Sequence, residues 1–326
     1  MILAGDIGGT KVNLCCMQRV DGRFEETCNA TYQSGQYENF EAVLQDWLDT
    51  NEVKVDAAVF GVAGPVVQGR VETTNLPWVL DAAALKERFS FRACDLLNDL
   101  VATAYGVPEL QPDEMEVLQE GHGGFEGTAV LTAAGTGLGE AGLYWNGESH
   151  LPIPSEGAHC EFGPRNEVED EMVRYLRKVH GHVSYERIIS GMGIANIYAF
   201  LRDTGRYAES GAEKEHMAGG IEPAVISELA LAESAELSVA AMRMFVEIYG
   251  AETGNLALRI MAYGGAYVGG GIAPKIMPLM RNGLFLKGFK DKGRFVSLME
   301  SIPVRVILND KTALLGAARR GEALLR

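Results

Sequence analysis

The stretch that decides the fold is residues 1–17, MILAGDIGGTKVNLCCM, where two apolar runs flank a turn with adjacent glycines. Residues 1–4 and 12–17 have the composition of buried strands, and the Gly8-Gly9 pair allows the positive φ angles of a tight turn. The pattern predicts a β-hairpin, to which residues 24–32 add a third antiparallel strand.

Residues 129–145, AVLTAAGTGLGEAGLYW, repeat this arrangement of a strand, a glycine turn with a threonine, and a returning strand. The repetition predicts two related α/β units that face one another. Buried strands are expected at 57–62 and 93–97, and Asp81 is expected to cap a short helix that runs to about residue 89. The chain is mostly helical from residue 167 onward, with one of the helices expected over 223–231.

The last strand and helix, residues 304–308 and 311–325, are predicted to return to the first unit, because a strand is most stable when it joins a sheet. The predicted domains are therefore a small α/β domain, 1–109 with 304–326, and a large α+β domain, 110–303.

Composition excludes several classes of protein. The 326 residues include 29 Lys and Arg against 44 Asp and Glu, and a net charge of −15 disfavours binding to nucleic acid. No apolar run is long enough to cross a membrane, and the N-terminus lacks the basic region of a signal peptide. Five cysteines without a CxxC pair favour a reducing cytoplasm over a disulfide framework or a four-cysteine zinc site.

Three glycine turns are candidates for nucleotide binding. In Gly8-Gly9-Thr10 and Gly135-Thr136-Gly137, backbone N–H groups and a hydroxyl can surround an anion, although each is also an ordinary turn. The glycines of 269–271 permit close approach to a flat ligand, or form a helix–helix turn before Pro274. Residues 137–142 match GxGxxG, but a dinucleotide site must open a helix, and a strand is expected here.

Polar residues gather at two further places. Asp99 follows Asn98 at the end of a predicted buried strand, where it either accepts a hydroxyl proton or only caps the next helix. The loop 155–161 holds Glu156, His159 and Glu161, which suit a polyhydroxylated ligand better than zinc. Glu186 either joins this cluster or is a solvated helix residue.

Taken in order, these motifs resemble the sugar kinases of the actin-like ATPase superfamily, and most of all the bacterial glucokinase family. The glycine turns are shared by the whole superfamily. The combination of Asn98-Asp99, the loop with Glu156 and His159, and Glu186 is far more specific. Related ROK sugar kinases carry a cysteine-rich zinc motif after the histidine. Here only Cys160 is present, so the chain resembles the zinc-free branch. That resemblance implies no metal ligands.

The resemblance implies two actin-like (ribonuclease H-like) α/β domains with a cleft between them, the larger one with additional helices. It implies a cytoplasmic homodimer that phosphorylates glucose with ATP and Mg²⁺ and binds neither nucleic acid nor membranes. Asp99 is implied to be the general base, and Asn98, Asp99, Glu156, His159 and Glu186 are implied to hold the sugar. The implied ATP-binding residues are Gly5, Asp6, Ile7, Gly8, Gly9, Thr10, Gly135, Thr136, Gly137, Gly269, Gly270 and Gly271. A kinase for fructose, mannose or an N-acetylated amino sugar remains an alternative, as does a sugar-sensing regulator.

Overall fold

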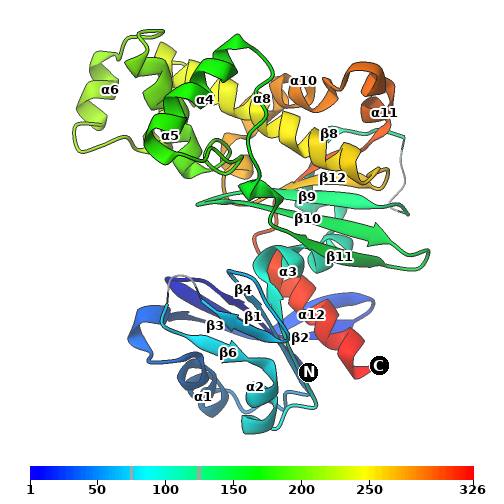
Figure 1. Ribbon diagram of the computed structural model, residues 1–326. Coiled ribbons are helices and arrows are strands. Elements are labelled where there is room, and N and C mark those ends of the chain that lie inside the picture. The colour runs from blue at the N-terminus through cyan, green and yellow to red at the C-terminus, as the bar shows by residue number, and fades with distance from the viewer. Residues whose placement is uncertain (74–75, 123–125) are drawn as a thin grey trace. The chain divides into compact units, whose positions relative to one another are not determined.

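The computed structural model describes residues 1–73, 76–122 and 126–326. The chain forms two compact units (Figure 1). Unit 1 comprises Met1–Pro112, His150–Pro154 and Asn309–Arg326, and unit 2 comprises Asp113–Ser149 and Ser155–Leu308. No helix of the described residues has the length and apolar character needed to span a membrane.

Unit 1 is built on a five-stranded sheet of order β3-β2-β1-β4-β7. Its strands are β1 (Ile2–Ile7), β2 (Lys11–Val20), β3 (Arg23–Gln33), β4 (Ala57–Val62) and β7 (Ala93–Asn98). The first three are antiparallel neighbours, whereas β1, β4 and β7 run parallel. The hairpin and third strand predicted from the sequence are therefore confirmed. A separate two-stranded sheet pairs β5 (Arg70–Glu72) with β6 (Val79–Asp81).

The helices of unit 1 bury apolar faces against this sheet. They are α1 (Phe40–Thr50), α2 (Ala82–Arg88), α3 (Asp99–Gly106) and α12 (Thr312–Leu325). Asp81 caps α2 as the sequence predicts, by accepting hydrogen bonds from two backbone N–H groups. The C-terminal α12 packs against α3, β1 and β4. Gly316 of α12 lies so close to α3 that a Cβ there would be 1.8 Å from the carbonyl oxygen of Ala102.

Unit 2 supplies five strands of a six-stranded sheet of order β11-β10-β9-β12-β13-β8, whose edge strand β11 belongs to unit 1 through residues His150–Pro154. The strands of this sheet are β8 (Met115–Gln119), β9 (Ala129–Ala134), β10 (Leu138–Trp145), β11 (His150–Ser155), β12 (Gly265–Gly269) and β13 (Val304–Ile307). β9 and β10 are antiparallel, and β9 is parallel to β12, as β1 is antiparallel to β2 and parallel to β4. The repetition seen in the sequence is therefore a repetition of topology.

The long, largely buried α8 (Glu236–Arg259) packs against β9 and β12. The other helices of unit 2 are α4 (Glu167–His180), α5 (Gly191–Asp203), α6 (Gly211–His216), α7 (Pro223–Leu231), α9 (Met277–Arg281), α10 (Leu284–Lys290) and α11 (Val296–Ser301). Helices α5, α7 and α10 pack directly against α8. One extensive apolar core joins these helices to the sheet.

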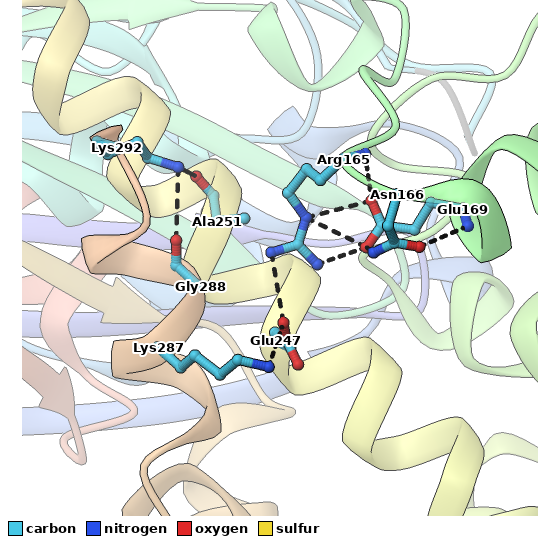
Figure 2. A network of polar contacts seen from close by, with 8 residues as sticks. All are labelled: Arg165, Asn166, Glu169, Glu247, Ala251, Lys287, Gly288 and Lys292. Carbon is cyan, nitrogen blue, oxygen red and sulfur yellow. Dashed lines mark hydrogen bonds and ion pairs between the residues drawn. The ribbon is translucent and has the colours of Figure 1, made fainter. Parts of the chain in front are cut away.

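A polar network ties the start of α4 to α8 and α10 (Figure 2). Arg165 donates to the buried carboxylate of Glu169, and its Nη1 atom lies 3.8 Å from Oε1 of Glu247 on α8. Glu247 also pairs with Lys287 of α10 at 3.1 Å. Lys292 donates to backbone carbonyl groups of α8 and α10, and burial lowers the pKa of its amine to about 8. Three segments far apart in sequence are thereby fixed together: the start of α4, the middle of α8, and the stretch from α10 to Lys292.

The prediction for the last strand is wrong. β13 pairs with β12 and β8 in the second sheet, not with the strands of unit 1. Its apolar residues Val304 and Val306 are fully buried in the core of unit 2. The last helix does belong to unit 1, so the chain leaves unit 2 after Leu308 rather than before residue 304. At the first boundary, Pro112 is the last residue of unit 1.

Candidate active site

In unit 1, the first glycine turn and the Asn98-Asp99 pair lie at the same edge of the sheet. β1, β4 and β7 are parallel, and their last residues Ile7, Val62 and Asn98 stand in one row. The turn that follows β1 is therefore two strands from Asn98, which is about 10 Å across the sheet. Ligands of open α/β sheets bind at this carboxyl edge.

The turn after β1 has a defined shape. The Gly8 amide donates to the carbonyl oxygen of Lys11 at 2.9 Å. Ser34, which is fully buried, donates through its hydroxyl to Gly8 O and through its amide to Thr10 O. Nothing in the local sequence pattern indicated Ser34. Burial raises the pKa of the Asp6 carboxyl, and a hydrogen bond with Asn13 opposes that rise.

Asn98, and not Asp99, caps helix α3. The Asn98 Oδ1 accepts from the amides of Leu100 at 3.0 Å and Val101 at 3.4 Å, while its Nδ2 donates to Gly64 O. The alternative interpretation of Asp99 as the N-cap is therefore wrong. Asp99 is the first residue of α3, and its Oδ1 accepts a hydrogen bond from the Leu100 amide at 2.9 Å. That bond orients the carboxyl group.

In unit 2, the structure brings Glu156, His159 and Glu186 together. The imidazole of His159 lies 3.8 Å from the Glu156 carboxylate and 3.9 Å from the Glu186 carboxylate. Backbone hydrogen bonds from Tyr185 to Cys160 and from Glu186 to Ala158 join the two segments. Glu156 and His159 are more than half exposed, so the cluster presents acceptors to a ligand from solvent.

The second glycine turn adjoins this cluster. Glu186 Oε2 accepts from the amide of Leu138 at 3.1 Å, and the Gly191 amide donates to Gly135 O at 2.9 Å. A Cβ at Gly137 would lie 2.4 Å from Glu186 Oε2, so a larger residue here would displace the Glu186 carboxylate from its present position. The GxGxxG match at 137–142 runs into strand β10, and the expectation that it opens no helix is confirmed.

The third glycine turn also adjoins the second. β12 is parallel to β9, and Gly269 stands beside Ala133. Gly270 has a φ of 81°, and its Cβ would lie 2.3 Å from Ala134 O. The turn therefore leaves a strand, which corrects the interpretation of a helix–helix turn. A short 3₁₀ helix, Ala273–Ile276, follows it.

Sequence reasoning missed a buried carboxyl behind the loop of residues 156–159. Glu140 on β10 is 1% exposed, and neither of its carboxyl oxygens has a hydrogen-bond partner among the described residues. A Cβ at Gly157 would lie 2.5 Å from Glu140 Oε2. Burial, reinforced by the negative charge of Glu252 and opposed by Arg259, raises the pKa of Glu140 to about 7. Glu140 falls between the predicted glycine turn and the strand expected at 143–145, so no local sequence pattern indicated its burial.

Within residues 1–73, 76–122 and 126–326, no group of three or more His, Cys, Asp and Glu side chains could hold a metal ion. Glu161, considered as a ligand together with Glu156 and His159, forms a backbone bridge to Ser184.

Each sheet contains an antiparallel strand pair joined by a glycine turn, β1 and β2 in one sheet and β9 and β10 in the other. This duplicated topology, together with the similarity to a solved glucokinase, identifies the class as a sugar kinase of the two-domain actin-like α/β fold. A family model described as glucokinase matches residues 3–323. The chain therefore belongs to the glucokinase family.

Similar proteins cover almost the whole chain. A glucokinase of Nostoc punctiforme is 40% identical over 336 aligned positions, which cover 98% of each chain. A glucokinase of Yersinia enterocolitica is 34% identical over 97% of this chain and 94% of its own. The crystal structure of a glucokinase from an Antarctic psychrotroph superposes with a TM-score of 0.88, at 29% identity, over 99% of this chain and 98% of that one.

Proposed function

We propose that this protein transfers the γ-phosphoryl group of ATP to the 6-hydroxyl of D-glucose, giving glucose 6-phosphate and ADP. Family membership supports the reaction. The observation that carries the residue roles is the row Ile7, Val62 and Asn98, which sets a glycine turn and the Asp99 carboxyl at one edge. Phosphoryl transfer requires such positioning more than covalent chemistry.

Asp99 is the proposed general base. Its carboxylate accepts the proton of the attacking sugar hydroxyl as the bond to phosphorus forms. The hydrogen bond from the Leu100 amide holds the carboxyl in one orientation before the sugar binds. The Asn98 Oδ1 accepts the capping hydrogen bonds of α3, and one N–H of its amide donates to Gly64 O. The remaining N–H of the amide is the group proposed to contact the sugar.

The other sugar hydroxyls are assigned to the cluster in unit 2. The gaps of 3.8 and 3.9 Å between His159 and the two carboxylates exceed hydrogen-bond distance. Acceptor atoms on Glu156, His159 and Glu186 therefore suit the donors of a polyhydroxylated ring. The three glycine turns supply backbone N–H groups for the polyphosphate and room for the adenosine.

The phosphoryl donor is proposed to be ATP with Mg²⁺ as part of the substrate. Asp6, at the end of β1, is proposed to orient Mg²⁺ through water, because a carboxylate beside a polyphosphate is repelled unless a cation intervenes. The family resemblance further supports a cytoplasmic homodimer, whose assembly light scattering at several protein concentrations would test.

The test is an ADP-release assay over a panel of hexoses with ATP or polyphosphate as donor. Glucose with ATP should give the highest kcat/KM. Asp99→Asn should lower kcat about 100-fold or more while both substrates still bind. Asp81→Asn is the matched control, since asparagine caps helix α2 as well as aspartate does, and its kcat should stay within about 2-fold of wild type.

Asp6→Asn should raise the Mg²⁺ concentration needed for half-maximal rate. Retention of most of the kcat by Asp99→Asn, together with an inactive Asp6→Asn at saturating Mg²⁺, would show that the two roles are reversed. A higher kcat/KM for another hexose would show that the protein is a kinase for that hexose, with the same type of reaction.

A further inference from the structure

Two glycine turns of unit 2 leave neighbouring strands side by side. β9 ends at Ala134 and leads into residues 135–137, while the parallel β12 ends at Gly269 and leads into Gly270 and Gly271. The Ile272 amide donates to Ala134 O at 3.2 Å, so the last carbonyl of β9 already links the two turns.

A single buried hydroxyl meets the ends of both strands. Tyr249 lies in the middle of α8 and is fully buried. Its phenol oxygen accepts a hydrogen bond from the Ala134 amide at 3.1 Å. The hydroxyl hydrogen has two acceptors in reach, Thr132 O at 3.3 Å and Gly269 O at 3.4 Å.

The helix that carries Tyr249 is anchored at the same place. Thr253, one turn further along α8, donates to the carbonyl oxygen of Tyr249 at 3.0 Å. Its hydroxyl also lies 2.9 Å from that of Thr132 on β9. The ring of Tyr249 packs edge-on against Phe285 of α10. The phenol therefore has little freedom to move away from the strand ends.

We propose that Tyr249 is a positioning residue for the nucleotide: its hydroxyl fixes the end of β9 relative to the end of β12, and so the separation of the two glycine turns. The inference rests on the proposed function, in which these turns hold the second phosphate site and the adenosine. Tyr249 touches no substrate and acts through Ala134 and Gly269.

The physical reason for this positioning role is that the Tyr249 hydroxyl accepts a hydrogen bond from the buried Ala134 amide. Without the hydroxyl, the buried Ala134 amide loses its acceptor, and an unpaired buried amide favours any rearrangement that reaches water or another acceptor. Such a shift moves residues 135–137 away from the geometry that fits a polyphosphate. The sugar cluster lies one step further away: Tyr249 makes no hydrogen bond to Glu186 or to the loop of residues 156–159 among the described residues, and Glu186 meets the second glycine turn through the Leu138 amide.

Tyr249→Phe removes the hydroxyl and retains the ring. We expect the KM for MgATP and the Kd for MgADP each to rise about 10-fold, with the KM for glucose within about 2-fold of wild type. Steady-state rates with each substrate varied in turn give the KM values, and calorimetric titration with MgADP gives the Kd. A purely structural role would reduce the amount of folded enzyme without separating the two KM values.

Tyr198→Phe is the matched control. Tyr198 of α5 is also fully buried in unit 2, but its hydroxyl bonds to Glu209 at 3.1 Å rather than to a strand end. Its substitution should leave both KM values and the Kd for MgADP unchanged. Tyr249→Met, which also lacks the hydroxyl and adapts to its surroundings, replaces Tyr249→Phe if that variant does not fold.

Hydrogen exchange tests the coupling in the wild-type chain itself. MgADP should slow amide exchange in residues 132–137 and 269–272 together. Folded variants that keep wild-type affinity for MgADP, or MgADP that slows exchange in neither segment, would refute the proposal. A wild-type chain that binds MgADP but phosphorylates no sugar would refute the proposed function alone, because the MgADP titrations would still test Tyr249.

Discussion

Replacement of the buried Glu140 by glutamine should remove a pH dependence from the stability of this protein. The pKa of Glu140 rises from 4.5 to about 7, because its carboxyl is buried and lies near the charge of Glu252. The folded state therefore holds a proton that the unfolded state releases at lower pH. The stabilising contribution is complete below pH 4.5 and is lost as the pH rises through about 7.

The magnitude follows from the size of the shift. At 1.36 kcal/mol per pKa unit, the change from 4.5 to about 7 corresponds to about 3 kcal/mol in the free energy of unfolding. Glutamine carries no titrating proton, so Glu140→Gln should lack this loss. Relative to the variant, wild type should become less stable by about 2–3 kcal/mol between about pH 5 and pH 8.5.

Urea denaturation of both proteins at several pH values measures this difference. Trp145, on the same strand as Glu140, gives a fluorescence signal from the affected region. Glu148→Gln is the matched control, because it removes the same charge from an exposed position after that strand. A constant difference between wild type and Glu140→Gln across the pH range would refute the reasoning, since it would mean that Glu140 is ionised to the same degree in both states.

Three further substitutions test packing and sugar binding. Gly316→Ala should destabilise the protein by about 1–3 kcal/mol in thermal or chemical unfolding, since its Cβ would lie 1.8 Å from Ala102 O; Gly211→Ala, where a Cβ meets nothing within 4 Å, should not. Glu156→Ala and His159→Ala should each lower kcat/KM for glucose about 5- to 150-fold and leave the Kd for MgADP unchanged. A loss of MgADP affinity in either variant would place these side chains in the nucleotide site.

The elements that could be predicted are those whose signal is local. The hairpin at the N-terminus follows from two apolar runs around Gly8 and Gly9, and it forms as expected. Helix α7 has the predicted bounds, Pro223–Leu231, because proline starts it and an apolar stretch fills it. The sequence of Asp81 followed by alanines likewise indicates a capped helix.

The elements that were missed depend on partners distant in sequence. Strand β8 falls in a stretch interpreted as a boundary, and it exists because its backbone pairs with β13, almost 200 residues later. The same pairing draws β13 into unit 2. A short apolar run such as Val304–Ile307 says that a strand is buried, but not which sheet it joins.

The residues of the candidate site also differ in whether a local sequence signal could indicate them. Glu156 and His159 were indicated by the polar loop 155–161, whereas Glu186 was assigned to them only through the family resemblance, and the three do lie together. Their roles, and that of Asp99, stay predictions until variants are measured. Glu140 and Tyr249 were invisible in the sequence, because an acid in a strand and a tyrosine in an apolar helix gain significance only from the strand ends and loops that fold against them.

The two units differ in the number of glutamate side chains that they bury. Every fully buried glutamate of the described residues lies in unit 2: Glu140, Glu169, Glu213 and Glu252. Burial of a carboxyl costs free energy unless hydrogen bonds or charges compensate it, and Glu169 and Glu213 are compensated by Arg165 and by serines. Glu140 is not compensated by any hydrogen bond from the described residues, and it lies against Gly157 in the proposed sugar loop. Apolar packing alone would favour a leucine at that position, so we expect that a functional constraint, rather than stability, has set the residue at position 140.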